Sequence, residues 1–312
     1  MPDIVVMFFV LGLVAGLLKS DLSIPKAAYE TLSLLLMLTI GLKGGMALHG
    51  ALSWGLVGEL ICVAALGAVI PLIVIPILIK LAKADAANAA SLAAHYGSVS
   101  AGTFAVALAY VGTHALATEG QVTLYLVMLE LPAILVALAL YRRLNAGKSE
   151  DHQSELWHET FTNRGVVLLV GGVIIGFMYG PINGAAVTQL FTSAFKAVLA
   201  LFSLEMGLTA AETLSPMPWK KWRLLLFALL APICLSLIGL SAGIAMGLSI
   251  GSVVILATLT ASASYIAAPA AIRTAIPNAD IGLAMLMSLG ITFPFNAIIG
   301  IPLYHQLALQ MM

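Results

Sequence analysis

The chain has 312 residues, of which 61% are hydrophobic and only 9% charged, whereas soluble domains carry roughly 25% charged residues. Fourteen basic and fourteen acidic side chains give a formal net charge of zero. The composition excludes a water-soluble single domain, and without a basic field a nucleic-acid partner is not expected.

Apolar segments separated by polar breaks predict an all-α polytopic membrane protein. Four windows (86–118, 165–195, 224–272 and 281–312) contain no Asp, Glu, Lys or Arg, and each exceeds the roughly 20 residues that span a bilayer core. The pattern predicts ten transmembrane helices, at about 3–19, 27–48, 53–80, 87–112, 120–142, 164–180, 185–212, 219–247, 250–275 and 280–308.

One sustained hydrophilic stretch divides the predicted spans into two groups of five. We therefore expect a first five-helix repeat at 1–143, a cytoplasmic linker at 144–163 and a second repeat at 164–312. Nearly all Lys and Arg residues fall at the odd-numbered connections, with Lys43 and Lys196 as the exceptions. The positive-inside rule then places these connections in the cytoplasm and both termini outside.

The two halves share motifs at a nearly constant separation. "IGLKGGMAL" (40–48) matches "MGLTAAETL" (206–214), "GSVSAGTFA" (97–105) matches "ASASYIAAP" (261–269), and Pro132 corresponds to Pro294. Because each half has an odd number of spans, the second half must be inverted relative to the first. This is the plan of many secondary transporters, whose substrate binds near the midplane where the repeats meet.

The fourth and ninth spans are interrupted at matching positions, "GSVSAGT" (97–103) and "TASASYIAAP" (260–269). Facing breaks would bring the positive N-termini of two half-helices to one point, which favours a bound anion. The hydroxyls available there belong to Ser98, Ser100, Thr103, Ser262 and Ser264. The alternative is that these small residues only allow helices to pack closely.

Ionisable residues inside spans are costly and therefore informative. Lys43 and Glu59 lie at equal distances from the middle of one hairpin, and Glu205 and Arg223 do so in the equivalent hairpin of the other half. The spacing predicts a structural ion pair for each couple, with snorkelling to the interface as the alternative for the two cations.

Glu130 differs because no basic residue lies at matching depth in an adjacent hairpin. It precedes Pro132, which removes a backbone donor and leaves a carbonyl unpaired one turn back. Glu130 is therefore the best single candidate for a cation or proton ligand. Otherwise it is a protonated acid hydrogen-bonded in a helix interface.

At these motifs the chain resembles the sodium-dependent bicarbonate transporter family first known from cyanobacteria. The matching segments are "IGLKGGMAL", "YGSVSAGTFAVAL", "ELPA", "LFSLEMGLTA", "TASASYIAAPAAIRTAIPNA" and "GIPLY", in the same order over nearly the whole chain. The resemblance implies a homotrimer of two inverted five-helix repeats, whose broken fourth and ninth helices cross, that imports bicarbonate with sodium. It also implies inhibition by a PII-like protein at the cytoplasmic face, although no motif here marks that contact.

The resemblance implies one binding region between the two breaks, where Ser100, Thr103, Ser262 and Ser264 retain the hydroxyl chemistry and Gly97 a flexible entry to the first break. With Ser98 and Ala267 added, the expected substrate-binding residues are Gly97, Ser98, Ser100, Thr103, Ser262, Ser264 and Ala267. Sodium is expected near Glu130, Ser100, Thr103 and Ser264. Sodium would be a transported ion, and no cofactor is expected.

Four positions depart from the family pattern. Gly102 replaces a usual serine and Ala101 stands where a glycine is common, so one side-chain ligand would be missing. Glu130 stands where an aspartate is more frequent. Lys43 replaces a small hydroxyl residue, and an ammonium reaching the site would substitute for sodium.

The leading hypothesis is therefore alternating-access import of bicarbonate, or a similar small anion, coupled to sodium across a bacterial plasma membrane. The alternatives are an organic-anion symporter or a sodium/proton antiporter, since fold does not fix function. A membrane enzyme or sensor has little support because no HExxH, GxSxG or Gly-rich phosphate loop occurs.

Overall fold

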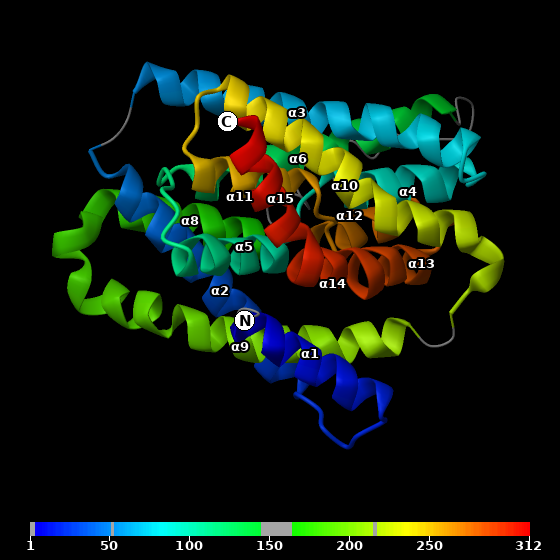
Figure 1. Cartoon of the computed structure of the whole chain (residues 1–312), viewed down its shortest axis with the longest axis horizontal. Helices are drawn as coiled ribbons and strands as arrows, with labels where there is room; N and C mark the ends of the chain where they lie inside the picture. The colour runs from blue at the N-terminus through cyan, green and yellow to red at the C-terminus, as the bar shows by residue number, and fades with distance from the viewer. Residues whose placement is uncertain (1–3, 51–52, 145–163, 215–216) are drawn as a thin grey trace.

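A computed structural model describes residues 4–50, 53–144, 164–214 and 217–312, and these residues form helices without any strand (Figure 1). Apart from Leu144, the predicted linker at 144–163 lies outside the described residues. An all-helical chain is thus confirmed for the part that the structure describes.

Each predicted span coincides with one or more helical elements. The elements are α1 (Ile4–Leu17), α2 (Lys26–Leu48), α3 (Trp54–Lys80), α4 (Ala86–Gly97), α5 (Ala101–Thr113), α6 (Val122–Leu144), α8 (Arg164–Asn183), α9 (Ala185–Thr213), η1 (Trp219–Lys221), α10 (Trp222–Ala245), α11 (Ile250–Thr260), α12 (Ala267–Ala275), α13 (Ile281–Met285), η2 (Leu286–Thr292), α14 (Phe293–Phe295), η3 (Asn296–Gly300) and α15 (Ile301–Met311). Within the described residues, seven helical segments are long and apolar enough to cross a membrane, with α4–α5, η1–α10 and α13–α15 each counted as one. Ile4–Leu17, Val170–Asn183 and Ile250–Thr260 are shorter apolar helices.

Helix packing follows the same scheme in both halves. In one group α1 packs on α9 and α2 packs on α8; in the other, α3 packs on α4 and α6, and α10 packs on α11 and η2. Figure 1 shows α1, α2 and α9 along one side of the molecule and α3 and α10 along the opposite side. If each helix is replaced by the corresponding helix of the other half, the contact between α1 and α9 becomes the contact between α8 and α2. In the same way, the contacts of α3 become the contacts of α10.

Matched glycines allow the helices of the first group to approach closely. A Cβ atom at Gly207 of α9 would lie 2.2 Å from the Phe9 carbonyl oxygen of α1. The corresponding Gly41 of α2 lies against Gly172 of α8, where an added Cβ would be 3.1 Å from the Gly41 Cα. Both crossings therefore require small residues, as close helix pairs in membranes do.

Reciprocal hydrogen bonds tie each broken helix to a connection of the other half. The backbone N–H of Asp280 donates to Asn88 Oδ1 of α4 at 2.8 Å, and that of Glu119 donates to Ser252 Oγ of α11 at 2.9 Å. Asn88 and Ser252 are separated by the same 164 residues as Ser98 and Ser262. The connections thus fix where the two breaks lie relative to each other.

Candidate functional site

Two helix breaks form the centre of the candidate site. The first spans 98–100, between α4 and α5, and the second spans 261–266, between α11 and α12. Pro269 lies in the first turn of α12, where its missing N–H costs no helical hydrogen bond. Both breaks coincide with the motifs that the sequence marks.

Hydrogen bonds donated by backbone N–H groups join the first broken helix to the second break. The N–H of Ser100 donates to Ser262 Oγ at 3.0 Å, and the N–H of Ser264 donates to the His95 carbonyl oxygen at 2.7 Å. Residues more than 160 positions apart in the sequence are therefore joined directly. The breaks satisfy part of each other's exposed backbone, which non-helical segments at membrane depth require.

Serine hydroxyls begin both second half-helices. Ser100 Oγ accepts the Thr103 N–H at 3.0 Å, and Ser264 Oγ accepts the Ala268 N–H at 3.2 Å. Each hydroxyl keeps its own hydrogen for a further acceptor. The N-termini of α5 and α12 carry partial positive charge beside these hydroxyls, an arrangement suited to a small anion.

Two hydroxyls at the breaks make no well-formed hydrogen bond among the described residues. They are Ser98 Oγ, in the first break, and Tyr265 Oη, in the second, which lies close to the Ser100 hydroxyl. Ser98 is fully buried and Tyr265 is 6% exposed. Because unpaired buried polar groups are costly, these two atoms indicate a place for a polar ligand.

Gly102 makes room for the Tyr265 hydroxyl. A Cβ atom at position 102 would lie 2.1 Å from Tyr265 Oη and 3.0 Å from Phe202 Cε1. Glycine stands at position 102 where the family usually has a serine. A hydroxyl is nevertheless present beside α5, because Tyr265 places its own hydroxyl there.

The remaining predicted substrate residues lie around these hydroxyls. Thr103 is buried in the first turn of α5, and Ala267 is the first residue of α12. Gly97 ends α4 in close packing, since a Cβ there would lie 2.6 Å from Pro71 Cγ and 3.0 Å from Ala133 Cβ. Glycine is therefore needed at position 97 because α3 and α6 leave no room for a side chain there.

Glu130 lies on α6, about one turn before the residue that packs against the end of α4. It is 7% exposed, and the structure gives its carboxylate no hydrogen-bond or ion-pair partner among the described residues. Ala133, three residues further along the same helix, is the residue that adjoins Gly97. Glu130 therefore offers an unpaired buried acid close to the end of α4.

The predicted ion pair between Lys43 and Glu59 was wrong. Lys43 Nζ lies over the Phe195 ring of α9, 4.7 Å from its centroid. Glu59 instead accepts hydrogen bonds from the Tyr125 hydroxyl and, at 3.2 Å, from Gln121 Nε2. Equal depth in the bilayer does not bring two side chains together when their helices turn them toward different neighbours.

The predicted pair of Glu205 and Arg223 was also wrong. Glu205 Oε1 accepts from Thr209 Oγ1 at 3.5 Å within α9, and Glu205 Oε2 has no partner among the described residues. The Arg223 guanidinium lies 5.5 Å from the centroid of the Trp222 ring at the start of α10. Arg223 is the second residue of α10.

Sequence reasoning missed a set of polar residues on the last helical segment. Asn296 Nδ2 donates to the Ala261 carbonyl oxygen at 2.9 Å, and Asn296 Oδ1 accepts from the Tyr304 hydroxyl at 2.7 Å. Two π-helical stretches, η2 and η3, flank α14 in this region. Such local widening is frequent at functional sites. The available signal was a lone Asn two residues after Pro294, in a window without charges.

Asn296→Ala should destabilise the protein, because the Ala261 carbonyl and the Tyr304 hydroxyl would lose their partner in a fully buried position. Leaving buried polar groups unpaired costs about 1–3 kcal/mol. Thermal unfolding of the detergent-solubilised protein should show a lower midpoint. Asn183→Ala, at an exposed position ending α8, is the matched control. Equal midpoints for both variants would contradict a structural role for Asn296.

Comparison with protein families settles which group the chain falls in. The sequence model of the Na⁺-dependent bicarbonate transporter superfamily matches residues 4–309. The chain belongs to this superfamily. The resemblance inferred from the motifs is thereby confirmed, and together with its apolar helices it makes the chain a membrane protein of a transporter family. Comparison with individually curated proteins returns no match.

Proposed function

We propose that the protein imports bicarbonate together with sodium and binds both ions where the two helix breaks cross. The observation that carries this proposal is the meeting of the breaks through Ser100, Ser262 and Ser264, with two unpaired buried hydroxyls beside them. Membership of the Na⁺-dependent bicarbonate transporter superfamily supports the choice of substrate and of coupling ion.

The anion binds at the N-termini of α5 and α12, where helix dipoles and hydroxyl hydrogens favour negative charge. Its proposed ligands are the substrate-binding residues predicted above, with the Tyr265 hydroxyl added. Sodium binds nearby, held by hydroxyls of Ser100, Thr103 and Ser264, by backbone carbonyls and by Glu130. Each ion neutralises the other, so binding of one favours binding of its partner.

The proposed architecture is ten spans in two inverted repeats that rock around the site and expose it alternately. The matched contacts of the two halves support this plan. We further propose a homotrimer in a bacterial plasma membrane, in contact with lipid, with both termini outside. A PII-like regulator at the cytoplasmic face remains part of the proposal.

Bicarbonate binding to purified protein tests this assignment. With sodium, titration calorimetry should show saturable binding, and replacing sodium by choline should weaken it by about tenfold or more, the size of a typical coupling free energy of 1–3 kcal/mol. Identical affinities in the two salts would contradict a shared site for the two ions.

Glu130→Gln should remove much of the sodium effect, since the unpaired carboxylate becomes neutral without changing its shape. We expect bicarbonate affinity in sodium to fall about tenfold, toward the affinity in choline. Glu205→Gln is the control, because that carboxylate also lacks an ion-pair partner among the described residues but already accepts a hydrogen bond from Thr209 on its own helix, α9, and is not a proposed ligand. An unchanged sodium effect in Glu130→Gln would remove Glu130 from the cation site.

A sodium/proton antiporter is the second candidate function, because Glu130 is a buried acid without a partner among the described residues and such a group can carry a proton. If Glu130 carries protons, adding sodium to proteoliposomes should collapse an imposed pH gradient in the absence of bicarbonate. Glu130→Gln should then abolish that collapse.

A further inference from the structure

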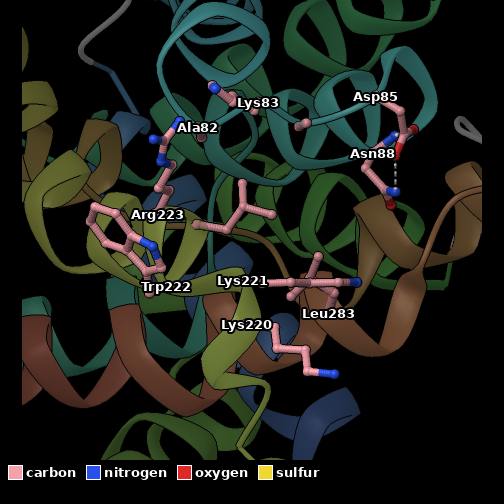
Figure 2. A pocket seen from close by; sticks show the side chains of 11 residues that line it. Ala82, Lys83, Asp85, Asn88, Lys220, Lys221, Trp222, Arg223 and Leu283 are labelled. Carbon is pink, nitrogen blue, oxygen red and sulfur yellow. Dashed lines mark hydrogen bonds between the residues drawn. The ribbon is translucent and has the colours of Figure 1, made fainter.

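A basic cavity of about 400 Å³ lies at one end of the molecule, apart from the helix breaks. Its walls come from the connection between α3 and α4, the start of α10 and the side of α13 (Figure 2). The lining residues are Ala82, Lys83, Ala84, Asp85, Asn88, Lys220, Lys221, Trp222, Arg223, Leu224 and Leu283. By the positive-inside rule this end faces the cytoplasm.

Four cations and one carboxylate line this cavity, and most of the cationic charge is unpaired. Asp85 accepts hydrogen bonds from the N–H of Asn88 at 2.9 Å and from Asn88 Nδ2 at 2.6 Å, as the N-cap of α4. Lys221 pairs with Asp280 at 2.9 Å. Within the described residues, Lys83, Lys220 and Arg223 have no carboxylate partner.

The start of α10 lies at this cavity. Its first residue, Trp222, donates its N–H to the Trp219 carbonyl oxygen of η1, so the 24-residue helix continues from that turn. Figure 2 shows Lys220 and Lys221 on one side of the cavity and Arg223 and Lys83 on the other. Trp222, 56% exposed, stands beside Arg223 at the membrane-surface end of the helix, where interfacial Trp residues are common.

We propose that this cavity binds a phosphate group, carried either by an anionic phospholipid or by a soluble phosphorylated compound. Two pairs of cationic side chains, Lys220 with Lys221 and Lys83 with Arg223, border the same cavity and suit an anion with several terminal oxygens and more than one negative charge. The volume is that of a small-molecule pocket, with room for the moiety that bears the phosphate. Basic pockets between helices on the cytoplasmic side are known to hold lipid headgroups of this kind.

Lys83 can be replaced by glycine without disturbing the backbone, so its charge can be tested separately from the fold. It has φ +56° at the end of α3, where the N–H of Ala84 reaches back to the Leu78 carbonyl oxygen. Glycine is the usual residue in this left-handed helix ending, so Lys83→Gly removes the cation and relieves strain at the same time. Lys19 ends α1 with the same φ of +56° and does not line the cavity, so Lys19→Gly is the matched control.

Asp280 offers a variant with the opposite effect. The hydrogen bond from the Lys221 ammonium holds the pKa of Asp280 below its ordinary value, so the carboxylate is charged at neutral pH. Asp280 Oδ1 also accepts the Leu283 N–H at 2.9 Å as the N-cap of α13. Asp280→Asn keeps an acceptor for that cap but frees Lys221, and should strengthen phosphate binding.

The test uses the full chain in lipid nanodiscs with two probes. In phosphatidylcholine discs, pyrophosphate is titrated while tryptophan fluorescence is followed; in parallel, native mass spectrometry counts phosphatidylglycerol retained from mixed discs. We expect saturable binding of at least one probe, weakened about tenfold by Lys83→Gly, unchanged by Lys19→Gly and strengthened severalfold by Asp280→Asn. Pyrophosphate binding identifies a soluble phosphate ligand, and phosphatidylglycerol retention alone identifies a lipid headgroup.

Three outcomes would overturn the proposal. They are no saturable binding of either probe, equal losses in Lys83→Gly and Lys19→Gly, and displacement of the probe by bicarbonate at the concentrations that saturate the transport site. The last result would assign the cavity to the anion pathway. None of these readouts requires transport, so the proposal stands or falls independently of the proposed function.

Discussion

Gly102→Ala is expected to reduce bicarbonate uptake by about 10- to 100-fold, because the new Cβ atom would collide with the Tyr265 hydroxyl. The added carbon would lie 2.1 Å from Tyr265 Oη, and Tyr265 is held by an edge contact with Phe293, with ring centroids 5.8 Å apart. Overpacking of this kind costs about 1–3 kcal/mol, and here the cost falls on the proposed site itself. Initial uptake rates into proteoliposomes measure the effect.

Two further variants make this prediction specific. Gly112→Ala, on the same helix, is the control, since nothing lies within 4 Å of an added Cβ there. Tyr265→Phe removes the colliding oxygen and also a proposed ligand, so it should lower uptake alone, but adding Gly102→Ala to it should cost much less than Gly102→Ala costs in the parent protein. An equal loss from Gly102→Ala in both backgrounds would show that Tyr265 is not what makes glycine necessary.

Ser98→Ala is expected to weaken bicarbonate binding by about tenfold or more without lowering the unfolding temperature. Ser98 Oγ has no partner among the described residues, so its removal leaves no protein group unpaired. A hydrogen bond to a charged group contributes about 1.5–3 kcal/mol, which the bound anion would lose. Calorimetric titration with bicarbonate and thermal unfolding measure the two quantities.

Ser262→Ala provides the comparison, because Ser262 Oγ accepts the N–H of Ser100 and donates to the Leu259 carbonyl oxygen at 2.8 Å. Its loss should lower both affinity and stability, by about 1–3 kcal/mol of unfolding free energy for the unpaired N–H. If Ser98→Ala destabilised the protein as much as Ser262→Ala and left affinity unchanged, Ser98 would be a packing residue.

Much of the fold was predictable because hydropathy alone decides where a chain can cross a bilayer. Charge-free windows located the apolar segments, and the paired motifs located both helix breaks, since small residues and hydroxyls weaken a helix locally. Gly41 and Gly207 correspond in the sequence and lie at corresponding helix crossings.

Side-chain partners were less predictable, since they depend on how each helix is rotated about its axis. Lys43 and Glu59 lie at equal distances from the middle of their hairpin in the sequence, yet Lys43 lies on Phe195 and Glu59 bonds to Tyr125. Asn296 reaches Ala261 because π-helical turns redirect the last segment, and no periodicity in the sequence marks those turns. Nothing in the sequence distinguishes Tyr265 from other aromatic residues, because the space that Gly102 leaves for its hydroxyl is visible only in the structure.

Sodium-driven uptake of labelled bicarbonate into proteoliposomes tests the central claim most directly, at a pH where bicarbonate dominates over dissolved carbon dioxide. An inward sodium gradient should produce accumulation above the external concentration, and dissipating the gradient should reduce uptake to simple equilibration. Equal uptake with and without the gradient, or no uptake in either condition, would contradict sodium-coupled bicarbonate transport.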